Sequence, residues 1–513
     1  MLAVALFISL FIFTSVKNIH APGIHYDEVL FGNAALGGTD GSFILLAFKG
    51  FPILLMSYIG ALKAYIFYPI FAIFGVSYET IRIPSILIMA FALVILHRAL
   101  RMFTSTKVAL ITLALLSVDT SLIVLTRTDM GPTVLEFLLK ALALYGYVYF
   151  IKTEKLKYGI IMLLAMYLGV FNKLNFIWTV NAFFLAAYIV HRDVWASAFR
   201  KLSRAGKIIS LVGVFLIYAY FTMVTLHYHV FSNQYGPLSF MQHCMQQLTV
   251  LLKLLDGTAV YLWIFYEPLQ TIFPTGLYMF LVMLCSVLTK SAAKISRKTI
   301  VFILLMFVLT AVQICLTPSA TSPWHTMSVY PFIIILFALA SDALAGAFFA
   351  QRKYVRILVT VALISPVLIT SILTYSRYSH SYTQPISHPA WSNKIDVLID
   401  YTHLQENSFV SIDWGIHNQL LIMNQKNTFF DHWEVLFKPM SKAQEQDYAR
   451  EFLDPDKKVI FVAHSDTYSF FPESKNNFIA LAQKYSLSVV KVKDIREGTD
   501  TFFELYMTQA HSE

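Results

Sequence analysis

Long apolar stretches recur along the chain from its first residues to about residue 375. A helix needs about 20 mostly apolar residues to cross the hydrocarbon of a bilayer. Hydrophobic residues make up 57% of the chain and charged residues only 13%, a low share for a globular protein. The sequence therefore predicts a polytopic α-helical membrane protein with about 11 transmembrane helices. The predicted spans are residues 1–17, 80–97, 108–126, 133–151, 158–172, 174–190, 207–227, 273–289, 299–317, 328–349 and 355–375.

The first span leads into a long connection, residues 18–79. Apolar residues follow Met1 at once, without a basic start, so we expect an uncleaved first span and not a signal peptide. Within the connection, residues 42–75 are apolar but are interrupted by two lysines and two prolines. We expect interfacial helices in this segment. A short extra membrane hairpin is the alternative, and it would leave the later topology unchanged.

Lysine and arginine are unevenly divided between alternate connections of the predicted spans. One set of connections holds 18 of them and the other set holds 7. Because positive charge collects in cytoplasmic loops, the first set is predicted to be cytoplasmic. The long first connection and everything after residue 375 then lie outside. This asymmetry also accounts for the net charge of +9 without a nucleic-acid partner.

The tail, residues 376–513, differs in character from the membrane part. The stretches "NSFVSIDWG", "KKVIFVAHS" and "SLSVVKVKD" are typical of buried or half-buried strands, and "SKAQEQDYAREFL" is typical of a helix. We therefore predict two domains, a transmembrane catalytic domain over residues 1–375 and a soluble extracytoplasmic α/β domain over residues 376–513. No P-loop and no GxGxxG motif for a nucleotide occurs in either part.

Several ionisable residues fall at the outer ends of the predicted spans or in the connections between them. Charged groups in or near hydrocarbon are costly, and they usually serve a function. These candidate residues are Asp27, Glu28, Lys63, Arg82, Arg127, Asp129, Lys173 and His325.

Each candidate also has an ordinary structural explanation. Asp27 and Asp129 can cap helix N-termini, the basic side chains can extend to lipid headgroups, and His325 can be a hydrogen-bonded loop residue. Their convergence at one surface favours a reaction instead. A carboxylate there can act as general base, while cations or a metal ion stabilise a departing phosphate. Since no nucleotide site is predicted, a donor taken from the lipid phase would explain why the site borders the bilayer.

The sequence resembles the GT-C membrane glycosyltransferases of the protein O-mannosyltransferase type. This group includes bacterial family 39-like enzymes and, more distantly, the aminoarabinose transferase of lipid A. The matching stretches follow the order of the family over about the first 350 residues. They are "HYDEVLFGNAA" (25–35), "YIGALKAYIFYPIFAIFGVSYETIRIPS" (58–85), "VDTSLIVLTRTDMGP" (118–132), "NKLNFIW" (172–178) and "HTMSVYPF" (325–332).

The resemblance implies a GT-C fold, a polyprenyl-phosphate-linked sugar donor and transfer with inversion at the anomeric carbon. By position in the motifs, Asp27 would be the catalytic base with Glu28 beside it, and Asp129 the second acid. The residues implied to hold the donor phosphate are Lys63, Arg82, Arg127, Lys173, His325 and Tyr330. No cofactor is predicted; a divalent metal remains possible, without a recognisable ligand set. The acceptor could be a protein, a lipid or a glycan, and the style of the matches favours a bacterial plasma membrane.

Two other classes of protein compete with the enzyme. A transporter or flippase of lipid-linked sugars would carry its key polar groups near the bilayer midplane, often in two repeated halves, and the sequence has neither feature. A membrane sensor or scaffold that presents the tail would explain the tail but not the acids and cations at the outer face.

Overall fold

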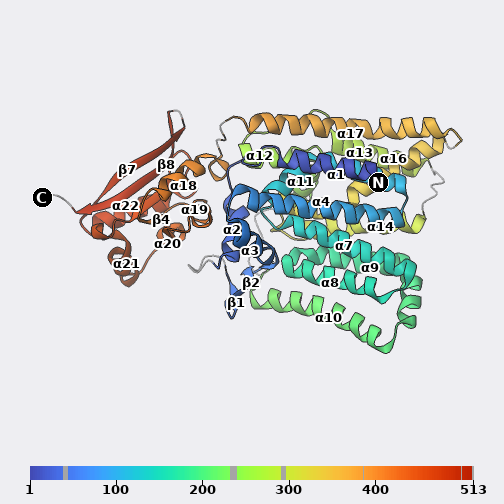
Figure 1. The fold of residues 1–513 in the computed structure, drawn as a ribbon, viewed down its shortest axis with the longest axis horizontal. Coiled ribbons are helices and arrows are strands. Elements are labelled where there is room, and N and C mark those ends of the chain that lie inside the picture. Colours follow the sequence, from blue (N-terminus) through green and yellow to red (C-terminus); the bar gives the residue numbers. More distant parts are fainter. Residues whose placement is uncertain are drawn as a thin grey trace.

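The computed structural model divides into a long helical region and an α/β region at one of its ends (Figure 1). It describes residues 1–37, 44–230, 240–289, 296–349, 351–384, 386, 388–497 and 499–510. The prediction of a polytopic helical protein with a C-terminal α/β part is confirmed.

Seven helices among the described residues are long and apolar enough to cross a membrane, or up to nine if each of two bent pairs is one span. The seven are α4 (Tyr78–Phe103), α7 (Thr133–Thr153), α9 (Ile177–Lys201, preceded by η1, Leu174–Phe176), α10 (Arg204–His227), α14 (Arg297–Cys315), α16 (Phe332–Phe349) and α17 (Lys353–Ser381). The bent pairs are α5 (Thr106–Val118) with α6 (Thr120–Thr128), and α11 (Phe240–Leu255) with α12 (Ala259–Phe265). Shorter apolar helices are α1 (Leu2–Val16), α3 (Leu62–Phe74), α8 (Leu156–Asn172) and α13 (Thr275–Leu288).

Each of the eleven predicted spans overlaps one of these helices or a bent pair. The single helices α1, α8 and α13 have fewer than 18 residues. The α11–α12 pair was not predicted, because glutamine and histidine side chains lower the hydropathy of α11. It turns by 91° between its two helices. The predicted span 108–126 is likewise two helices at 60°.

Asp119 causes the bend between α5 and α6. Its Oδ1 accepts the backbone N–H of Leu122 at 2.7 Å, so it caps α6, and its Oδ2 accepts the hydroxyl of Tyr330 at 3.2 Å. Side-chain caps of this kind satisfy the free N–H groups at a helix start. The buried aspartate within this span is therefore explained by helix capping and packing.

The prediction of interfacial helices in the first connection is wrong for residues 46–60. They form an antiparallel sheet of β1 (Leu46–Phe48), β2 (Phe51–Met56) and β3 (Ile59–Gly60), and only α3 is helical. Lys49 and Gly50 form the turn between the paired Phe48 and Phe51, with φ of 50° and 83°. Positive φ at both central residues is characteristic of two-residue hairpin turns. Residues 42 and 43 of the predicted segment lie outside the described residues.

The α/β region contains a five-stranded sheet in the order β5-β4-β6-β8-β7. Strand β4 pairs in parallel with both β5 and β6. Strand β8 pairs antiparallel with β6 on one side and with β7 on the other. The three predicted strands correspond to β4, β6 and β7. The elements in chain order are η3 (Pro389–Trp391), α18 (Lys394–His403), β4 (Ser408–Ser411), α19 (His417–Met423), β5 (Thr428–Asp431), α20 (Trp433–Phe437), α21 (Lys442–Tyr448), η4 (Ala449–Leu453), η5 (Pro455–Lys457), β6 (Ile460–His464), α22 (Pro472–Lys484), β7 (Leu487–Glu497) and β8 (Asp500–Ala510).

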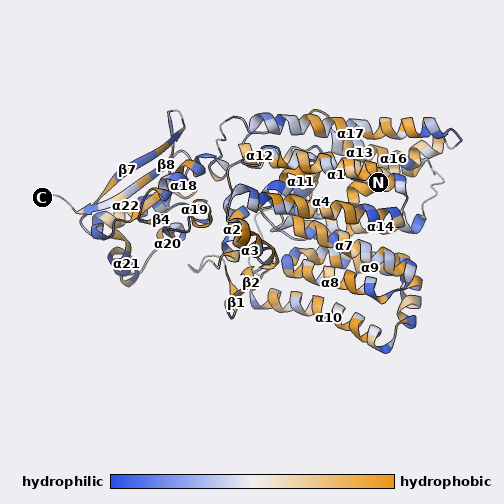
Figure 2. Cartoon of the chain, viewed as in Figure 1, coloured by the Kyte–Doolittle hydropathy of each residue, from blue (hydrophilic) through white to orange (hydrophobic). Residues whose placement is uncertain are grey.

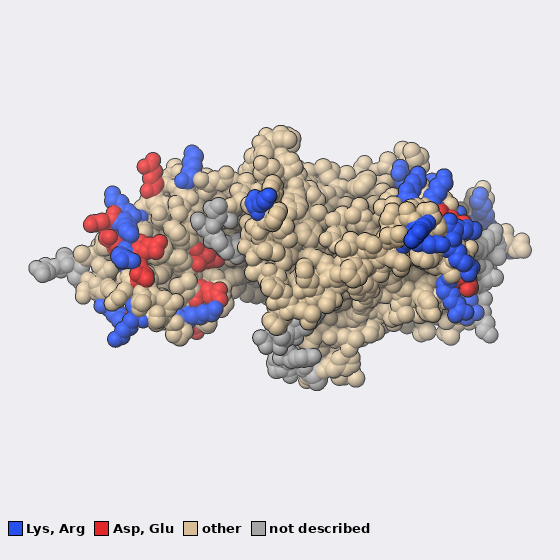
Figure 3. All heavy atoms as spheres, turned by 90° about the horizontal axis from the view of Figure 1, so that it is seen from below, with Lys and Arg blue, Asp and Glu red and all other residues tan. Residues whose placement is uncertain are grey.

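Charge and hydropathy are divided along the long axis. Apolar residues dominate the helices, and polar residues gather at their far end and in the α/β region (Figure 2). Figure 3 shows Lys and Arg side chains gathered at the end opposite the α/β region, with a broad, nearly uncharged surface between. Ion pairs join helix ends there, such as Lys107 and Arg356 with Asp342 at 2.8 and 2.9 Å. The uncharged belt is what a membrane-embedded surface requires.

The α/β region docks on the segment that follows α1. Gly23 donates its N–H to the carbonyl of Trp391 at 2.9 Å, and a Cβ at Gly23 would lie 2.3 Å from the carbonyl oxygen of Ser392. Only glycine permits this approach. In α2 (Tyr26–Ala35), the hydroxyl of Tyr26 donates to Asp431 at 2.9 Å. The start of α2 therefore lies between the two regions of the protein.

Candidate functional site

His25 caps the N-terminus of α2. The His25 Nδ1 atom accepts the N–H of Asp27 at 3.1 Å, and the Glu28 carboxylate accepts the N–H of His25 at 3.3 Å. Together they form a reciprocal cap that occupies His25 and Glu28. Asp27 is therefore not the cap, and no donor among the described residues bonds its carboxylate.

Asp27 lines a cavity of about 580 Å³ between the helical and the α/β regions. Burial raises the pKa of Asp27 to about 6, and the positive charge of Lys173 partly opposes that rise. Two histidines, His25 and His388, also line the cavity. The aromatic side chains around it are Trp263, Tyr266, Trp324, Trp391, Trp414 and Phe470. We call this space the aromatic cavity.

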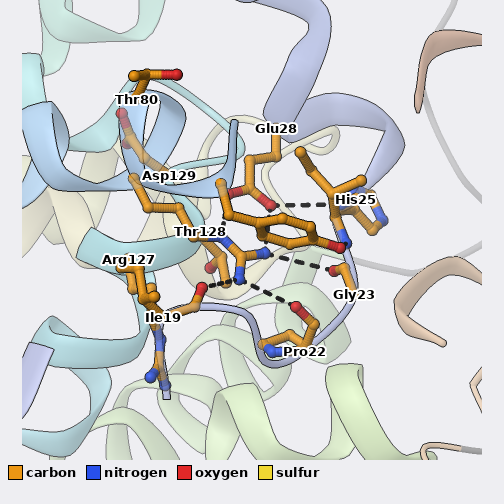
Figure 4. A network of polar contacts seen from close by, with 12 residues as sticks. Ile19, Pro22, Gly23, His25, Glu28, Thr80, Arg127, Thr128 and Asp129 are labelled. Carbon is orange, nitrogen blue, oxygen red and sulfur yellow. Dashed lines mark hydrogen bonds and ion pairs between the residues drawn. The ribbon is translucent and has the colours of Figure 1, made fainter. Parts of the chain in front are cut away.

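Glu28 is turned away from the cavity into a buried ion pair with Arg82 of α4. The Arg82 Nε and Nη2 atoms donate to the two carboxylate oxygens at 2.6 and 2.8 Å. The remaining N–H groups of Arg82 donate to the carbonyls of Ile19, Pro22 and Gly23 (Figure 4). All five donors of the guanidinium are thus used inside the chain. Neither Glu28 nor Arg82 lines the aromatic cavity.

Lys63 and Asp129 form a second buried ion pair at 2.7 Å, with side chains 3% and 2% exposed. The ammonium of Lys63 also donates to the Asp129 carbonyl at 2.9 Å and lies 4.8 Å from the ring of Phe31. The other carboxylate oxygen of Asp129 accepts the N–H of Val134 at 3.0 Å in the first turn of α7. The helix-capping alternative for Asp129 is therefore correct, and the pair joins α3 to the start of α7.

Lys173 lines a second cavity, of about 470 Å³, together with His325 and Asn175. Its ammonium donates to the carbonyl of Gly131 at 3.3 Å, and no carboxylate among the described residues lies within ion-pair distance of it. Both polar atoms of the Asn175 amide and the Nδ1 of His325 are buried without a partner in the described part of the chain. Burial lowers the pKa of His325 to about 3. We call this space the polar cavity.

The two cavities adjoin. Met130 and Trp324 line the aromatic cavity, while His325 lines the polar cavity. A Cβ at Gly131 would lie 3.1 Å from the Lys173 ammonium and 3.3 Å from the indole of Trp324. A glycine at this position therefore keeps the partition between Asp27 and Lys173 thin.

Arg127 and Tyr330 lie apart from both cavities. The Nη1 of Arg127 donates to the carbonyl of Lys17 at 2.6 Å, and its guanidinium lies 4.7 Å from the ring of Tyr382. Tyr330 is fully buried and bonds Asp119. Of the predicted site residues, the structure thus gathers Asp27, Lys173 and His325 around two adjoining cavities, with Lys63 and Asp129 as a buried pair.

The residues that the sequence did not identify are His25, His388 and the tryptophans of the aromatic cavity. Their only signal was aromatic residues in polar connections, as in "HPAW" and "SIDWG". Asp413 of the second stretch bonds His464 at 2.9 Å and accepts the N–H of Phe470 at 3.2 Å, which fixes one cavity wall. Within the described ranges, no group of three or more His, Cys, Asp or Glu side chains is placed to hold a metal ion.

The fold is similar to that of known membrane glycosyltransferases. ArnT from Cupriavidus metallidurans in the apo state has a TM-score of 0.60 and 13% identity, covering 98% of this chain and 97% of that chain. The same enzyme bound to undecaprenyl phosphate has a TM-score of 0.53 and 15% identity, with the same coverage. The archaeal oligosaccharyltransferase AglB from Archaeoglobus fulgidus, in complex with an inhibitory peptide and a dolichol-phosphate, has a TM-score of 0.50 and 11% identity, covering 93% and 70%.

The architecture is that of a polytopic helical membrane protein with an ArnT-like fold. Residues 61–226, about a third of the chain, match the family described as dolichyl-phosphate-mannose-protein mannosyltransferase. The partial family match and the similar fold both relate the chain to membrane glycosyltransferases. No curated protein sequence matches it.

Proposed function

We propose that the protein transfers a sugar from a polyprenyl-phosphate donor to an acceptor hydroxyl, with inversion at the anomeric carbon and with Asp27 as the catalytic base. The observation that carries the proposal is the carboxylate of Asp27, unbonded within the described chain and facing a cavity, with its pKa raised to about 6. A base with a pKa close to the operating pH combines the unprotonated state with useful proton affinity.

Lys173 is the proposed partner of the donor phosphate. Lys63 and Arg82 already bind carboxylates, and Arg127 lines neither cavity. Lys173 lines the polar cavity and bonds one carbonyl. The polar cavity adds the unpartnered Asn175 amide and neutral His325. A cation with hydrogen-bonding groups around it stabilises the charge that develops on a departing phosphate.

The two cavities support a single displacement. The acceptor oxygen attacks the anomeric carbon from the aromatic cavity as its proton passes to Asp27. The bond from that carbon to the phosphate oxygen breaks on the other side, and polyprenyl phosphate leaves as an anion beside Lys173. Attack and departure on opposite faces of the sugar invert its configuration. Asp27 then releases its proton to water.

The distribution of charge supports an active site on the extracytoplasmic side. The basic end of the molecule is opposite the α/β region (Figure 3), and basic connections stay in the cytoplasm. The aromatic cavity lies where the α/β region docks, so it opens away from the cytoplasm in this orientation. We place the protein in a bacterial plasma membrane.

Replacing Lys173 with glutamine is expected to weaken donor binding about 10- to 100-fold. A hydrogen bond to a charged group contributes about 1.5–3 kcal/mol, and glutamine removes the charge while keeping a polar side chain. The measurement is the Kd for labelled undecaprenyl phosphate in nanodiscs. Lys157→Gln, at an exposed position of the basic end, is the control and should bind as the wild type does. An unchanged Kd for Lys173→Gln would remove Lys173 from the phosphate site.

A further inference from the structure

We propose that the aromatic cavity binds a neutral, hydroxyl-rich sugar as the acceptor of the transfer, with the Nε2–H groups of His25 and His388 donating to its hydroxyl oxygens. This inference rests on the proposed function, in which Asp27 of the same cavity takes the acceptor proton. It names the acceptor class that the proposed function leaves open.

The backbone fixes the protonation of both histidines. The Nδ1 of His25 accepts the N–H of Asp27 at 3.1 Å, and the Nδ1 of His388 accepts the N–H of Ala390 at 3.1 Å. A ring nitrogen that accepts a hydrogen bond carries no proton, so the neutral imidazole carries its proton on Nε2. Neither Nε2–H has an acceptor among the described residues, and both rings line the cavity.

An aromatic neighbour covers one face of each histidine ring. The ring of His25 lies 4.2 Å from that of Trp391, and the ring of His388 stacks on Tyr266 at 3.9 Å with an angle of 26°. Two fixed N–H donors and one carboxylate, that of Asp27, therefore face the same space. Sugar hydroxyls can accept from the first two and donate to the third.

The walls of the cavity suit the flat faces of sugar rings. Trp263 and Trp324 lie 5.1 Å apart on the helical side, and Trp414 and Phe470 lie 4.9 Å apart on the α/β side. The faces of aromatic rings carry negative charge density, which attracts the weakly positive C–H groups of a pyranose face. A cavity of about 580 Å³ falls within the usual size of a small-ligand site.

The charge of the cavity argues against anionic acceptors. Its described lining residues include no lysine or arginine, and burial lowers the pKa of His25 to about 3 and that of His388 to about 4. A phosphate would therefore find no counter-charge among them. The cavity also offers an extended peptide no strand edge to pair with, since none of the described lining residues lies in a strand.

The binding test needs no donor. The full-length protein in nanodiscs is titrated with neutral oligosaccharides of glucose, mannose, galactose and N-acetylglucosamine, with an alkyl glucoside, with glucose 6-phosphate and with a Ser/Thr peptide. Four of the seven tryptophans line the cavity, so intrinsic fluorescence reports occupancy. We expect a saturable change with at least one neutral sugar and none with glucose 6-phosphate or the peptide. The alkyl glucoside distinguishes a lipid-borne sugar from a soluble one.

A matched pair of variants tests the role of His388. In His388→Asn, the side-chain oxygen can still accept the N–H of Ala390, but no donor reaches the place of Nε2. In His388→Gln, an N–H donor reaches that place, but the bond to Ala390 is lost. We expect sugar binding about tenfold weaker in His388→Asn and within about threefold of wild type in His388→Gln. His25→Asn and His25→Gln should repeat the pattern.

Three results would overturn the inference. The first is fluorescence that no neutral sugar changes although the protein is folded. The second is wild-type sugar affinity in both asparagine variants. The third is binding of the donor's own sugar alone, in competition with the intact donor. The experiments distinguish a failure of this inference from a failure of the proposed function. Sugar binding without transfer from any polyprenyl-phosphate donor would refute that function alone, whereas transfer to a peptide without sugar binding would refute only this inference.

Discussion

Asp27→Asn should lower the rate of sugar transfer by about 10²- to 10⁴-fold and leave donor affinity within about twofold of the wild type. Asparagine keeps the size of the side chain but cannot accept the acceptor proton. Donor phosphate is proposed to bind at Lys173, in the neighbouring cavity, so its affinity should not depend on the base. The measurements are initial rates of label transfer in proteoliposomes and the Kd for undecaprenyl phosphate.

The pH dependence tests the same assignment from another side. The base must be unprotonated, and the pKa of Asp27 is about 6. The value of kcat/KM should therefore be level above about pH 7 and fall about tenfold per unit below pH 6, in proportion to the ionised fraction. Asp400→Asn, an exposed position on α18, is the control and should leave both rate and profile unchanged. Full activity in Asp27→Asn would contradict the assignment.

Arg82→Ala should destabilise the protein by about 3–5 kcal/mol, because it leaves the buried carboxylate of Glu28 without its partner. It also removes the hydrogen bonds from Arg82 to the carbonyls of Ile19, Pro22 and Gly23. These bonds hold the segment that leads to Asp27. The measurement is the midpoint of thermal unfolding in detergent, followed by tryptophan fluorescence. A large fall in that midpoint is expected.

Two further variants separate this explanation from a direct role in donor binding. Adding Glu28→Gln to Arg82→Ala removes the unpaired charge and should recover part of the lost stability. Lys438→Ala breaks an exposed pair with Glu434 and should change stability by less than about 1 kcal/mol. A stable Arg82→Ala protein with weakened undecaprenyl phosphate binding would restore the phosphate role that the motif suggested for Arg82.

The sequence predicted the membrane architecture well because hydropathy alone determines which segments can enter a bilayer. It also placed the charged residues at one end of the helices. It could not predict which charges pair. Asp27 and Glu28 are neighbours, but successive residues on a helix point about 100° apart, so one faces a cavity and the other faces Arg82. Arg82 is 54 residues away, and only the packing of α4 against the first connection makes it the partner.

The aromatic cavity could not be predicted from the sequence for a similar reason. Its lining comes from the start of α2, the connection before α7, the α12 segment and α15 (Pro323–Thr326, followed by η2, Met327–Val329). The α/β region adds η3 with the residue before it and two connections. No local pattern indicates that Trp263 and Trp414 will face the same space. The hairpin did have a local signal, the two-residue turn at Lys49 and Gly50. The apolar composition of the segment masked this signal.

The most direct measurement supplies purified protein in proteoliposomes with anomerically defined, labelled polyprenyl-phosphate sugars and a panel of neutral oligosaccharides. The label is followed from lipid to product, and the anomeric configuration of the new bond is read by NMR. We predict that the label leaves one donor, appears in a sugar product of inverted configuration, and does neither with Asp27→Asn. Intact donor crossing the bilayer without transfer, or a product of retained configuration, would contradict a single displacement driven by Asp27.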